Sequence, residues 1–296
     1  MLNLHEPIFF HRYTLRSKRA LSPIIQRSEI EGALVKIGQG FGCLQPWPEL
    51  GDLPLARQLS ILEKGGQTSH LDRLRICCKI DGLARKLKRN ELAELNIPPS
   101  HVIHPERGKI VKVKCGADVR QEAERIAGIE AEKLRLDFNG ALSVAQFREF
   151  VIRLDSATIQ RIDFVEDPFD DHQFWWDKVQ QELPFDLAAD RQPVRARVNV
   201  LKPACDDIRE FAGRVVFTSY MDHPLGQFFA AREASAYYAG HPQQREYCGL
   251  ATHTLFEPDA FLERVQLDGE GRLLPPSGTG LGFDDLLESL PWQKLH

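Results

Sequence analysis

The chain has 296 residues, of which 43% are hydrophobic and 27% are charged, and its formal net charge is -4. This length allows one large core or two domains, and the composition is that of an ordinary globular protein. The net charge gives no electrostatic reason to expect nucleic acid or an acidic membrane as a partner.

Membrane and secretory signals are missing from the sequence. No run of residues reaches the about 18 apolar residues of a membrane span, and residues 1–19 contain no apolar stretch of signal-peptide length. The six cysteines include no C-x-x-C pair, which favours free thiols in a reducing compartment. These patterns predict a cytoplasmic protein.

The N-terminal part of the chain predicts a small α+β unit. Residues 7–17 and 28–43 have the composition of strands, and Gly38, Gly40 and Gly42 indicate a tight turn or a close backbone approach. Helical spacing of aliphatic residues begins near Leu53, resumes near Ser69 and continues to about Leu87. We expect a domain over residues 1–98, completed by the tail, 253–296.

From residue 99 to residue 252 the pattern changes to alternating strands and helices, which is typical of a parallel sheet. Strands are predicted at 101–104, 110–115, 134–138, 162–166, 185–190, 197–202, 214–220 and 247–252. Helices are predicted at 118–132, 143–154, 171–181, 204–212 and 224–239. Eight strands indicate a closed barrel. The connection at 105–109 and the interval from Asp190 to Lys202 are too short for full crossover helices. Either the barrel is trimmed or one strand is misplaced, and we expect a trimmed barrel.

Charged residues end several of these strands. Lys114, Asp137, Glu166, Asp190 and Lys202 follow one another at or near successive strand ends. The carboxyl ends of barrel strands converge on one mouth, where catalytic groups collect. Carboxylate oxygens suit a hard cation such as Mg²⁺. The alternative for any single acidic residue is a helix cap, but three on successive strands, flanked by lysines, favour a metal site between two bases.

This arrangement predicts a class of reaction. A metal bound to a substrate carboxylate lowers the cost of removing the adjacent α-proton, and a lysine near cations can act as the base. Lys112 lies on the same side of its strand as Lys114, and Arg135 lies one layer below Asp137. Arg135 needs an anionic partner, which is either a substrate carboxylate or a structural carboxylate of the barrel.

The order and spacing of these motifs resemble a known superfamily. The motifs are K-V-K at 112–114, L-R-L-D-F-N at 134–139, F-V-E-D-P at 164–168, A-A-D at 188–190, L-K-P at 201–203, V-V-F-T-S-Y at 215–220, G-L-A-T at 249–252 and G-T-G-L-G at 278–282. Together they resemble the enolase superfamily in its K-x-K, or muconate-lactonising, subgroup, and within it the o-succinylbenzoate synthases. The resemblance implies a (β/α)7β-type TIM-like barrel with an α+β capping domain.

The resemblance also implies an activity and a set of roles. The activity is the Mg²⁺-dependent dehydration of 2-succinyl-6-hydroxy-2,4-cyclohexadiene-1-carboxylate to 2-succinylbenzoate in menaquinone biosynthesis, with Mn²⁺ as a substitute metal. Lys114 would be the base and Lys202 would stabilise the enolate, with Lys112 supporting Lys114 and touching substrate. Asp137, Glu166 and Asp190 would hold the metal. The remaining implied positions are Asn139 beside the metal ligands, and Ser219, Tyr220 and Gly249 at the succinyl part.

Two departures keep alternatives open. The third acidic residue is followed by Arg191-Gln192, where the family usually has Glu-Ser, and the connection before Lys202 is short. An N-acylamino acid racemase would use the same site residues, and a non-catalytic barrel could retain the metal site. The last barrel strand lacks the Asp-x-Asp of dipeptide epimerases, which counts against that activity. We expect a small carboxylate as the substrate. The oligomeric state is left open, with a monomer among the options.

Overall fold

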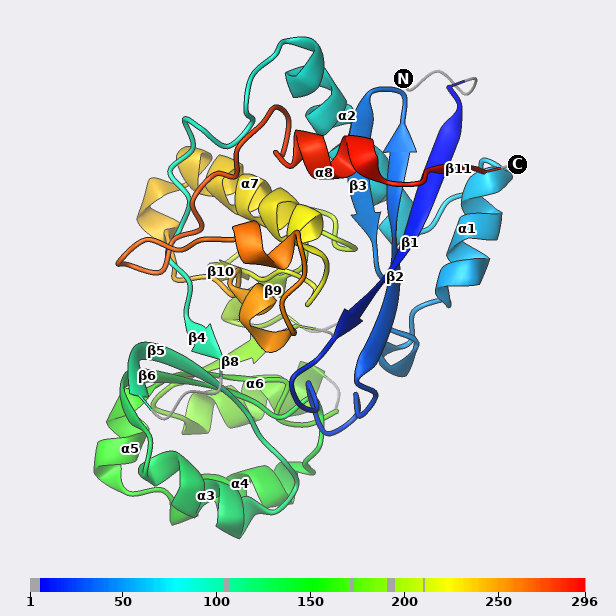
Figure 1. Cartoon of the computed structure of the whole chain (residues 1–296). Coiled ribbons are helices and arrows are strands. Elements are labelled where there is room, and N and C mark those ends of the chain that lie inside the picture. The colour runs from blue at the N-terminus through cyan, green and yellow to red at the C-terminus, as the bar shows by residue number, and fades with distance from the viewer. Residues whose placement is uncertain (1–5, 104–106, 171–172, 191–194, 210, 296) are drawn as a thin grey trace. The chain divides into compact units, whose positions relative to one another are not determined.

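The computed structural model describes residues 6–103, 107–170, 173–190, 195–209 and 211–295 (Figure 1). The chain forms two compact units. The first consists of Met1–Ser100, Lys202–Ile208 and Phe217–His296, and the second of His101–Leu201 and Arg209–Val216. The predicted domain boundaries, at 98 and 252, stay a prediction.

The first unit contains a four-stranded antiparallel sheet in the order β11-β1-β2-β3. Its strands are β1 (Ile8–Arg16), β2 (Glu29–Ile37), β3 (Gly40–Leu44) and β11 (Gln293–Lys294). The predicted strand region 28–43 is a hairpin, and its turn uses Gly38 at a φ of 61°, which glycine adopts without strain. Strand β11 pairs with β1 through Phe9 and Lys294, so the tail returns to the N-terminal sheet as expected.

Two helices accompany this sheet, α1 (Leu55–Glu63) and α2 (Ser69–Lys86). The Thr68 side chain caps α2 by accepting a hydrogen bond from the backbone N–H of Leu71. The buried side of both helices packs with the strands in one apolar cluster, which contains Ala33, Val35, Leu44, Leu55, Leu59, Leu62, Leu71, Leu74 and Cys78. Amphipathic spacing therefore places α2 where the sequence predicted it.

The C-terminal part of the first unit contains α7 (Pro224–Gly240) and α8 (Asp284–Ser289). His223 caps α7, because its Nδ1 accepts a hydrogen bond from the N–H of Leu225 at 3.2 Å. Short 3-10 turns complete the unit at Pro48–Leu50, Pro242–Gln244, Thr252–Leu255 and Leu262–Arg264. The helix predicted at 224–239 is confirmed.

The second unit is built on a seven-stranded sheet in the order β10-β9-β8-β7-β6-β5-β4, and its strand pairs from β4 to β9 are parallel. The strands are β4 (Val102–Ile103), β5 (Arg107–Lys114), β6 (Glu130–Asp137), β7 (Ile162–Glu166), β8 (Asp186–Ala189), β9 (Val198–Leu201) and β10 (Arg214–Phe217). Because β4 to β9 pair in parallel and follow one another in chain order, each of these strands places its carboxyl end beside that of the next.

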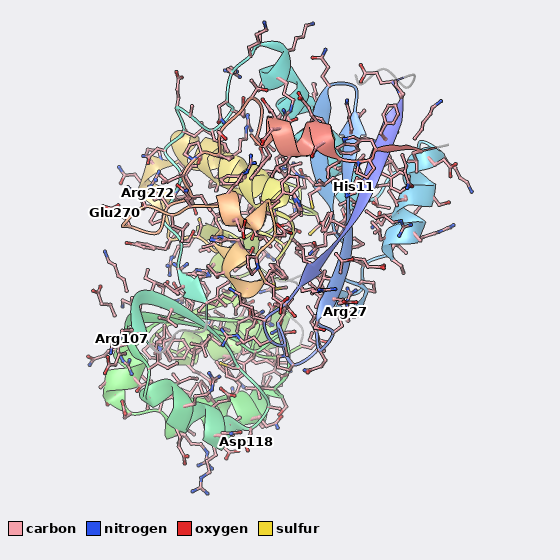
Figure 2. The ribbon with its side chains drawn as sticks, viewed as in Figure 1. His11, Arg27, Arg107, Asp118, Glu270 and Arg272 are labelled. Atoms are coloured by element: carbon pink, nitrogen blue, oxygen red, sulfur yellow. The ribbon has the colours of Figure 1, made fainter. Side chains whose placement is uncertain are left out.

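Four helices connect these strands: α3 (Val119–Ala127), α4 (Val144–Arg153), α5 (Ser156–Arg161) and α6 (Gln173–Glu182). The first of them is capped by Asp118, labelled in Figure 2, whose side chain accepts hydrogen bonds from two backbone N–H groups. Phe138, Phe147 and Phe150 pack with edge-on or stacked rings between strand and helix. Helices α3, α4 and α5 lie together along the strands in Figure 1.

Two predicted elements differ from the structure, and one observed helix was not predicted. The strand predicted at 247–252 is reduced to two isolated bridges, Ser100 to Cys248 and Thr218 to Gly249. The helix predicted at 204–212 is absent from the described part of that segment, because the Asp206 carboxylate binds the N–H of Lys202 and closes a turn instead. Helix α5 was not predicted. The short connection at 105–109 falls partly outside the described residues.

Within the described ranges, no helix combines the length and the apolar character that crossing a bilayer requires.

We expect Gly40→Ala to lower the free energy of unfolding by about 1–3 kcal/mol. A Cβ atom at Gly40 would lie 1.8 Å from the carbonyl oxygen of Cys78, so β3 and α2 would have to separate. Gly240→Ala is the matched control, because a Cβ atom there meets nothing within 4 Å. Urea unfolding of both variants checks this, and equal stabilities would contradict the close approach of β3 to α2.

Candidate active site

Three of the candidate residues occupy one row across the parallel sheet. Lys114 ends β5 and pairs in register with Asp137 at the end of β6, and Asp137 pairs with Glu166 at the end of β7. Side chains in one row of a parallel sheet point to the same side. Strand register therefore brings these three predicted residues together.

The ammonium group of Lys112 joins the two carboxylates of this row. Its Nζ donates to both oxygens of Glu166, at 2.8 and 2.7 Å, and lies 2.9 Å from Oδ2 of Asp137. Lys114 makes a shorter contact, 2.5 Å, to the same Oδ2, and lies 3.4 Å from Oδ1 of Asn139. The Lys112 side chain is 9% exposed and that of Lys114 is 16% exposed. Lys112 is thus held by two carboxylates, whereas Lys114 is held by one and reaches solvent more readily.

Burial and charge act against each other in this cluster. Burial alone would lower the pKa of Lys112, but Asp137, Glu166 and Asp190 outweigh it and raise that pKa above its ordinary value. Burial would raise the pKa of Asp137, but Lys112 and Lys114 hold it far below its usual range. Burial and the neighbouring charge of Asp137 raise the pKa of Glu166 to about 8. Loss of hydration and repulsion by Asp137 therefore oppose the ionisation of Glu166, and a cation beside this carboxyl would favour it.

Asp190 follows β8 and is held by a residue that the sequence prediction did not include. The backbone N–H of Asp190 donates to Oδ1 of Asp167 at 3.2 Å, and Asp167 is buried with a positive φ of 40°. Its E-D-P context, a carboxylate directly before proline, is the signal that could have identified it. Arg191, predicted to alter the surroundings of Asp190, lies outside the described residues.

Asp137 and Glu166 have the chemistry of ligands for a hard divalent cation, because their carboxylate oxygens are buried and adjacent. In the part of the chain that the structure describes, no group of three or more His, Cys, Asp or Glu side chains is close enough to hold a metal ion. The structure brings two of the three predicted ligands together, and the inclusion of Asp190 stays a prediction.

The structure favours the structural alternative for Arg135. Its side chain is 1% exposed, and Nε donates to Oδ2 of Asp163 at 2.7 Å. Nη1 lies 3.3 Å from Nδ1 of His101, and the guanidinium lies over the ring of Phe164. Burial would raise the pKa of Asp163, but Arg135 and Arg214 keep it below its ordinary value. Arg135 therefore forms an internal ion pair with Asp163. Its charge predicted an anionic partner, but the sequence did not identify which residue it would be.

The other candidate residues belong to the first unit. Lys202 is buried, and its Nζ lies 5.8 Å from the centre of the Tyr220 ring. Ser219 donates its N–H to the carbonyl oxygen of Gly249 at 3.0 Å, so these two predicted substrate contacts are neighbours. The Ser219 hydroxyl also lies 2.6 Å from that of Thr252.

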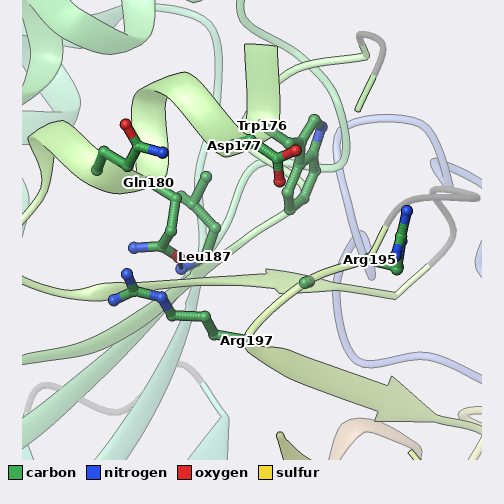
Figure 3. Close-up of a pocket in the computed structure, with 8 residues that line it drawn as sticks. Trp176, Asp177, Gln180, Leu187, Arg195 and Arg197 are labelled. Carbon is green, nitrogen blue, oxygen red and sulfur yellow. Dashed lines mark hydrogen bonds between the residues drawn. The ribbon is translucent and has the colours of Figure 1, made fainter. Parts of the chain in front are cut away.

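A separate surface pocket lies beside α6 (Figure 3). It is lined by Trp176, Asp177, Gln180, Gln181, Leu187, Arg195, Ala196 and Arg197, none of which is a candidate site residue. Trp176 is buried and packs against Phe169, with ring centres 5.7 Å apart. This tryptophan is therefore mainly a packing residue of the second unit.

The whole fold is similar to that of known barrel enzymes. A dipeptide epimerase from Cytophaga hutchinsonii, solved with Mg and D-Ala-L-Val, has a TM-score of 0.73 at 17% identity over 98% of this chain and 99% of that one. A muconate lactonizing enzyme from Pseudomonas fluorescens has a TM-score of 0.69 at 14% identity over 93% and 95%. The fold is thus that of the enolase superfamily, a TIM-like barrel with an additional α+β part, as predicted.

Sequence comparison is more specific. Residues 8–84 match the family model "O-succinylbenzoate synthase, N-terminal domain". The o-succinylbenzoate synthase of Bdellovibrio bacteriovorus is 32% identical over 325 residues, covering 97% of this chain and 98% of the relative. The chain belongs to the o-succinylbenzoate synthase family, which is a family of lyases.

We expect Lys112→Met to lower the free energy of unfolding by about 3–5 kcal/mol, because it leaves two buried carboxylates without their shared cation. Lys133→Met is the control, since Lys133 is exposed in the neighbouring strand and should change stability by no more than about 0.5 kcal/mol. Adding Glu166→Gln to Lys112→Met should recover part of the loss. Urea unfolding measures all three, and equal stability of the two lysine variants would contradict the pairing.

Asp222 predicts a pH dependence of stability. Burial raises the pKa of its carboxyl from 3.8 to about 7, and its Oδ1 has no hydrogen-bond partner. Between these values the folded chain keeps a proton on Asp222 that the unfolded chain has lost. Its contribution to the free energy of unfolding therefore falls as the pH rises from about 4 to 7, by up to ~4 kcal/mol, and is constant above.

Asp222→Asn should remove this decline, so its stability relative to the unaltered chain should increase steadily over that pH range. The exposed Asp207 provides the control variant, Asp207→Asn. Unfolding curves at several pH values would contradict the expectation if the two variants followed the same trend.

Proposed function

We propose that this chain catalyses the Mg²⁺-dependent dehydration of 2-succinyl-6-hydroxy-2,4-cyclohexadiene-1-carboxylate to 2-succinylbenzoate, a step of menaquinone biosynthesis in the cytoplasm. Membership of the family supports the reaction. The observation that carries the site is the row formed by Lys114, Asp137 and Glu166, with Lys112 between the carboxylates.

The proposed metal ligands are Asp137, Glu166 and Asp190, with Asn139 as a neighbour that supports Lys114 and Asp137 through its amide and backbone. Bound by these residues, Mg²⁺ would supply Lewis-acid stabilisation for the charge that develops on the substrate carboxylate. Lys112, which pairs with Asp137 and Glu166, is proposed to contact a substrate anion as well. Ser219 and Gly249 are proposed to contact the succinyl part.

Lys114 is proposed to carry out both proton transfers. In its neutral form, its Nζ takes the α-proton, so the carbon–hydrogen bond breaks and the electron pair passes into the carboxylate as an enediolate. The electron pair then returns to the ring, and the bond between the adjacent carbon and its hydroxyl breaks. Lys114 gives its proton to the departing oxygen, so water leaves and the ring becomes aromatic. Lys202 is proposed to stabilise the enediolate with its positive charge.

Racemisation of an N-acylamino acid is the second candidate. It needs the same proton abstraction and would use Lys114 and Lys202 in turn as base and acid. Two epimerases share the fold, at 17% and 16% identity, which bears on the fold alone. The dehydration is preferred because the family relative is a synthase.

The test supplies purified protein with the cyclohexadiene acid and, separately, with an N-succinylamino acid, in Mg²⁺ and in chelator. We expect aromatic absorbance to grow only with the first substrate and only with Mg²⁺. Lys114→Ala should lower the rate by about 10²–10⁴-fold, whereas Lys133→Ala, a change at an exposed lysine, should not.

Loss of optical rotation without aromatic absorbance would identify the racemase instead. Absence of chelator-sensitive deuterium uptake from solvent at the α-carbon of either acid would indicate a non-catalytic barrel. An undiminished rate for Lys114→Ala would remove that lysine from the mechanism.

A further inference from the structure

The backbone around Lys202 is fixed by a tight local turn. The N–H of Lys202 donates to Oδ2 of Asp206 at 2.6 Å. The carbonyl oxygen of Lys202 accepts hydrogen bonds from the N–H groups of Cys205 and Asp206, at 2.9 and 2.8 Å. Both ends of the residue are therefore constrained, and the direction of its long side chain depends on what surrounds it.

The aromatic ring of Tyr220 is one such neighbour. The Nζ of Lys202 lies 5.8 Å from the ring centre, and both residues are buried. An ammonium group at this distance is attracted by the electron-rich face of the ring, and the attraction increases where water is excluded. Tyr220 thus offers Lys202 a favourable position without neutralising its charge.

Tyr220 is itself held by residues far earlier in the chain. Its hydroxyl donates to Oδ2 of Asp52 at 2.9 Å, and its carbonyl oxygen accepts a hydrogen bond from the indole N–H of Trp47 at 2.7 Å. The backbone N–H of Trp47 donates to the same Asp52 oxygen at 2.7 Å, and His70 lies 3.3 Å from it. The side chain of Tyr220 is therefore bound to Asp52, and its backbone is bound to Trp47.

Arg73 makes a second connection to the same turn. Its Nε donates to the carbonyl oxygen of Pro203, the residue after Lys202, at 2.9 Å. The guanidinium also pairs with Glu233 and lies over the ring of Phe229. Arg73 is buried in α2, so its position is set by the packing of that helix.

We propose that Tyr220 and Arg73 are positioning residues for Lys202, and that Trp47 and Asp52 act by holding Tyr220. The N-terminal segment 47–73 would then control the rate of the reaction through Lys202. The inference rests on the proposed function of Lys202 as the group that stabilises the enediolate. It replaces the substrate contact first expected for Tyr220.

A double-mutant cycle tests the inference with the cyclohexadiene acid as substrate. Tyr220→Leu removes the ring and should lower kcat about tenfold, the equivalent of a cation–π contact of ~1.4 kcal/mol, with little change in KM. In a Lys202→Ala background, Tyr220→Leu should cause no further loss, because its effect passes through the missing ammonium group. Circular dichroism and thermal unfolding establish that each variant is folded.

Tyr237→Leu is the matched control, because Tyr237 is a buried tyrosine that packs against Phe217 and His241. It should lower the melting temperature and leave kcat unchanged. Tyr220→Phe keeps the ring and loses the hydroxyl bond to Asp52, so its loss of kcat should be smaller than that of Tyr220→Leu. This milder variant also preserves the test if Tyr220→Leu does not fold.

The second connection is tested by Arg73→Lys, which keeps a positive charge beside Glu233 but lacks the forked donor that reaches Pro203. Its kcat should fall, and that fall should vanish in the Lys202→Ala background.

If the fold losses in kcat of the single variants multiply when they are combined with Lys202→Ala, the positioning role is overturned, while the proposed function of Lys202 is left intact. An undiminished rate for Lys202→Ala alone would overturn both the role of Lys202 and the inference built on it.

Discussion

The pairing of one buried ammonium group with two buried carboxylates is the interaction on which the candidate site depends. Asp137 and Glu166 lie at adjacent strand ends, where loss of hydration and mutual repulsion would each oppose ionisation. The ammonium group of Lys112 contacts both carboxylates and offsets their mutual repulsion. Burying such a charge without a partner costs several kcal/mol. The same two carboxylates thus need a cation for the stability of the sheet and are the groups proposed to bind a divalent metal.

Parallel register turns a scattered set of residues into this cluster. Lys114, Asp137 and Glu166 are separated along the chain by whole helices, yet they occupy one row because β5, β6 and β7 pair in register. A shift of one residue would turn a side chain to the opposite face of the sheet. The same fold supports epimerases and lactonizing enzymes at 14–17% identity. The sheet therefore defines a type of site, and the residues around it define the chemistry.

The first unit contributes to function through packing as well as through individual side chains. The close approach of β3 to α2 sets the position of that helix, and α2 carries His70 and Arg73. In the proposed scheme Arg73 acts on Lys202 together with Tyr220, which Trp47 and Asp52 hold, and none of these residues touches the reacting atoms. Stability and catalysis would then depend on the same helix, most of which lies within residues 8–84, the part that the family model matches.

The sequence by itself determined the fold class, the helices α2 and α7, the strand ends that carry Lys114, Asp137 and Glu166, and the family. Periodicity and strand-end chemistry are local properties, so neighbouring residues encode them. Only the tertiary structure decided that Arg135 pairs with Asp163, that Asp167 holds Asp190, and that the segment at 204–212 closes a turn instead of forming a helix. These outcomes depend on which distant groups meet in a buried space. There, the cost of an unpaired charge or hydrogen-bonding group selects partners that spacing along the chain does not reveal.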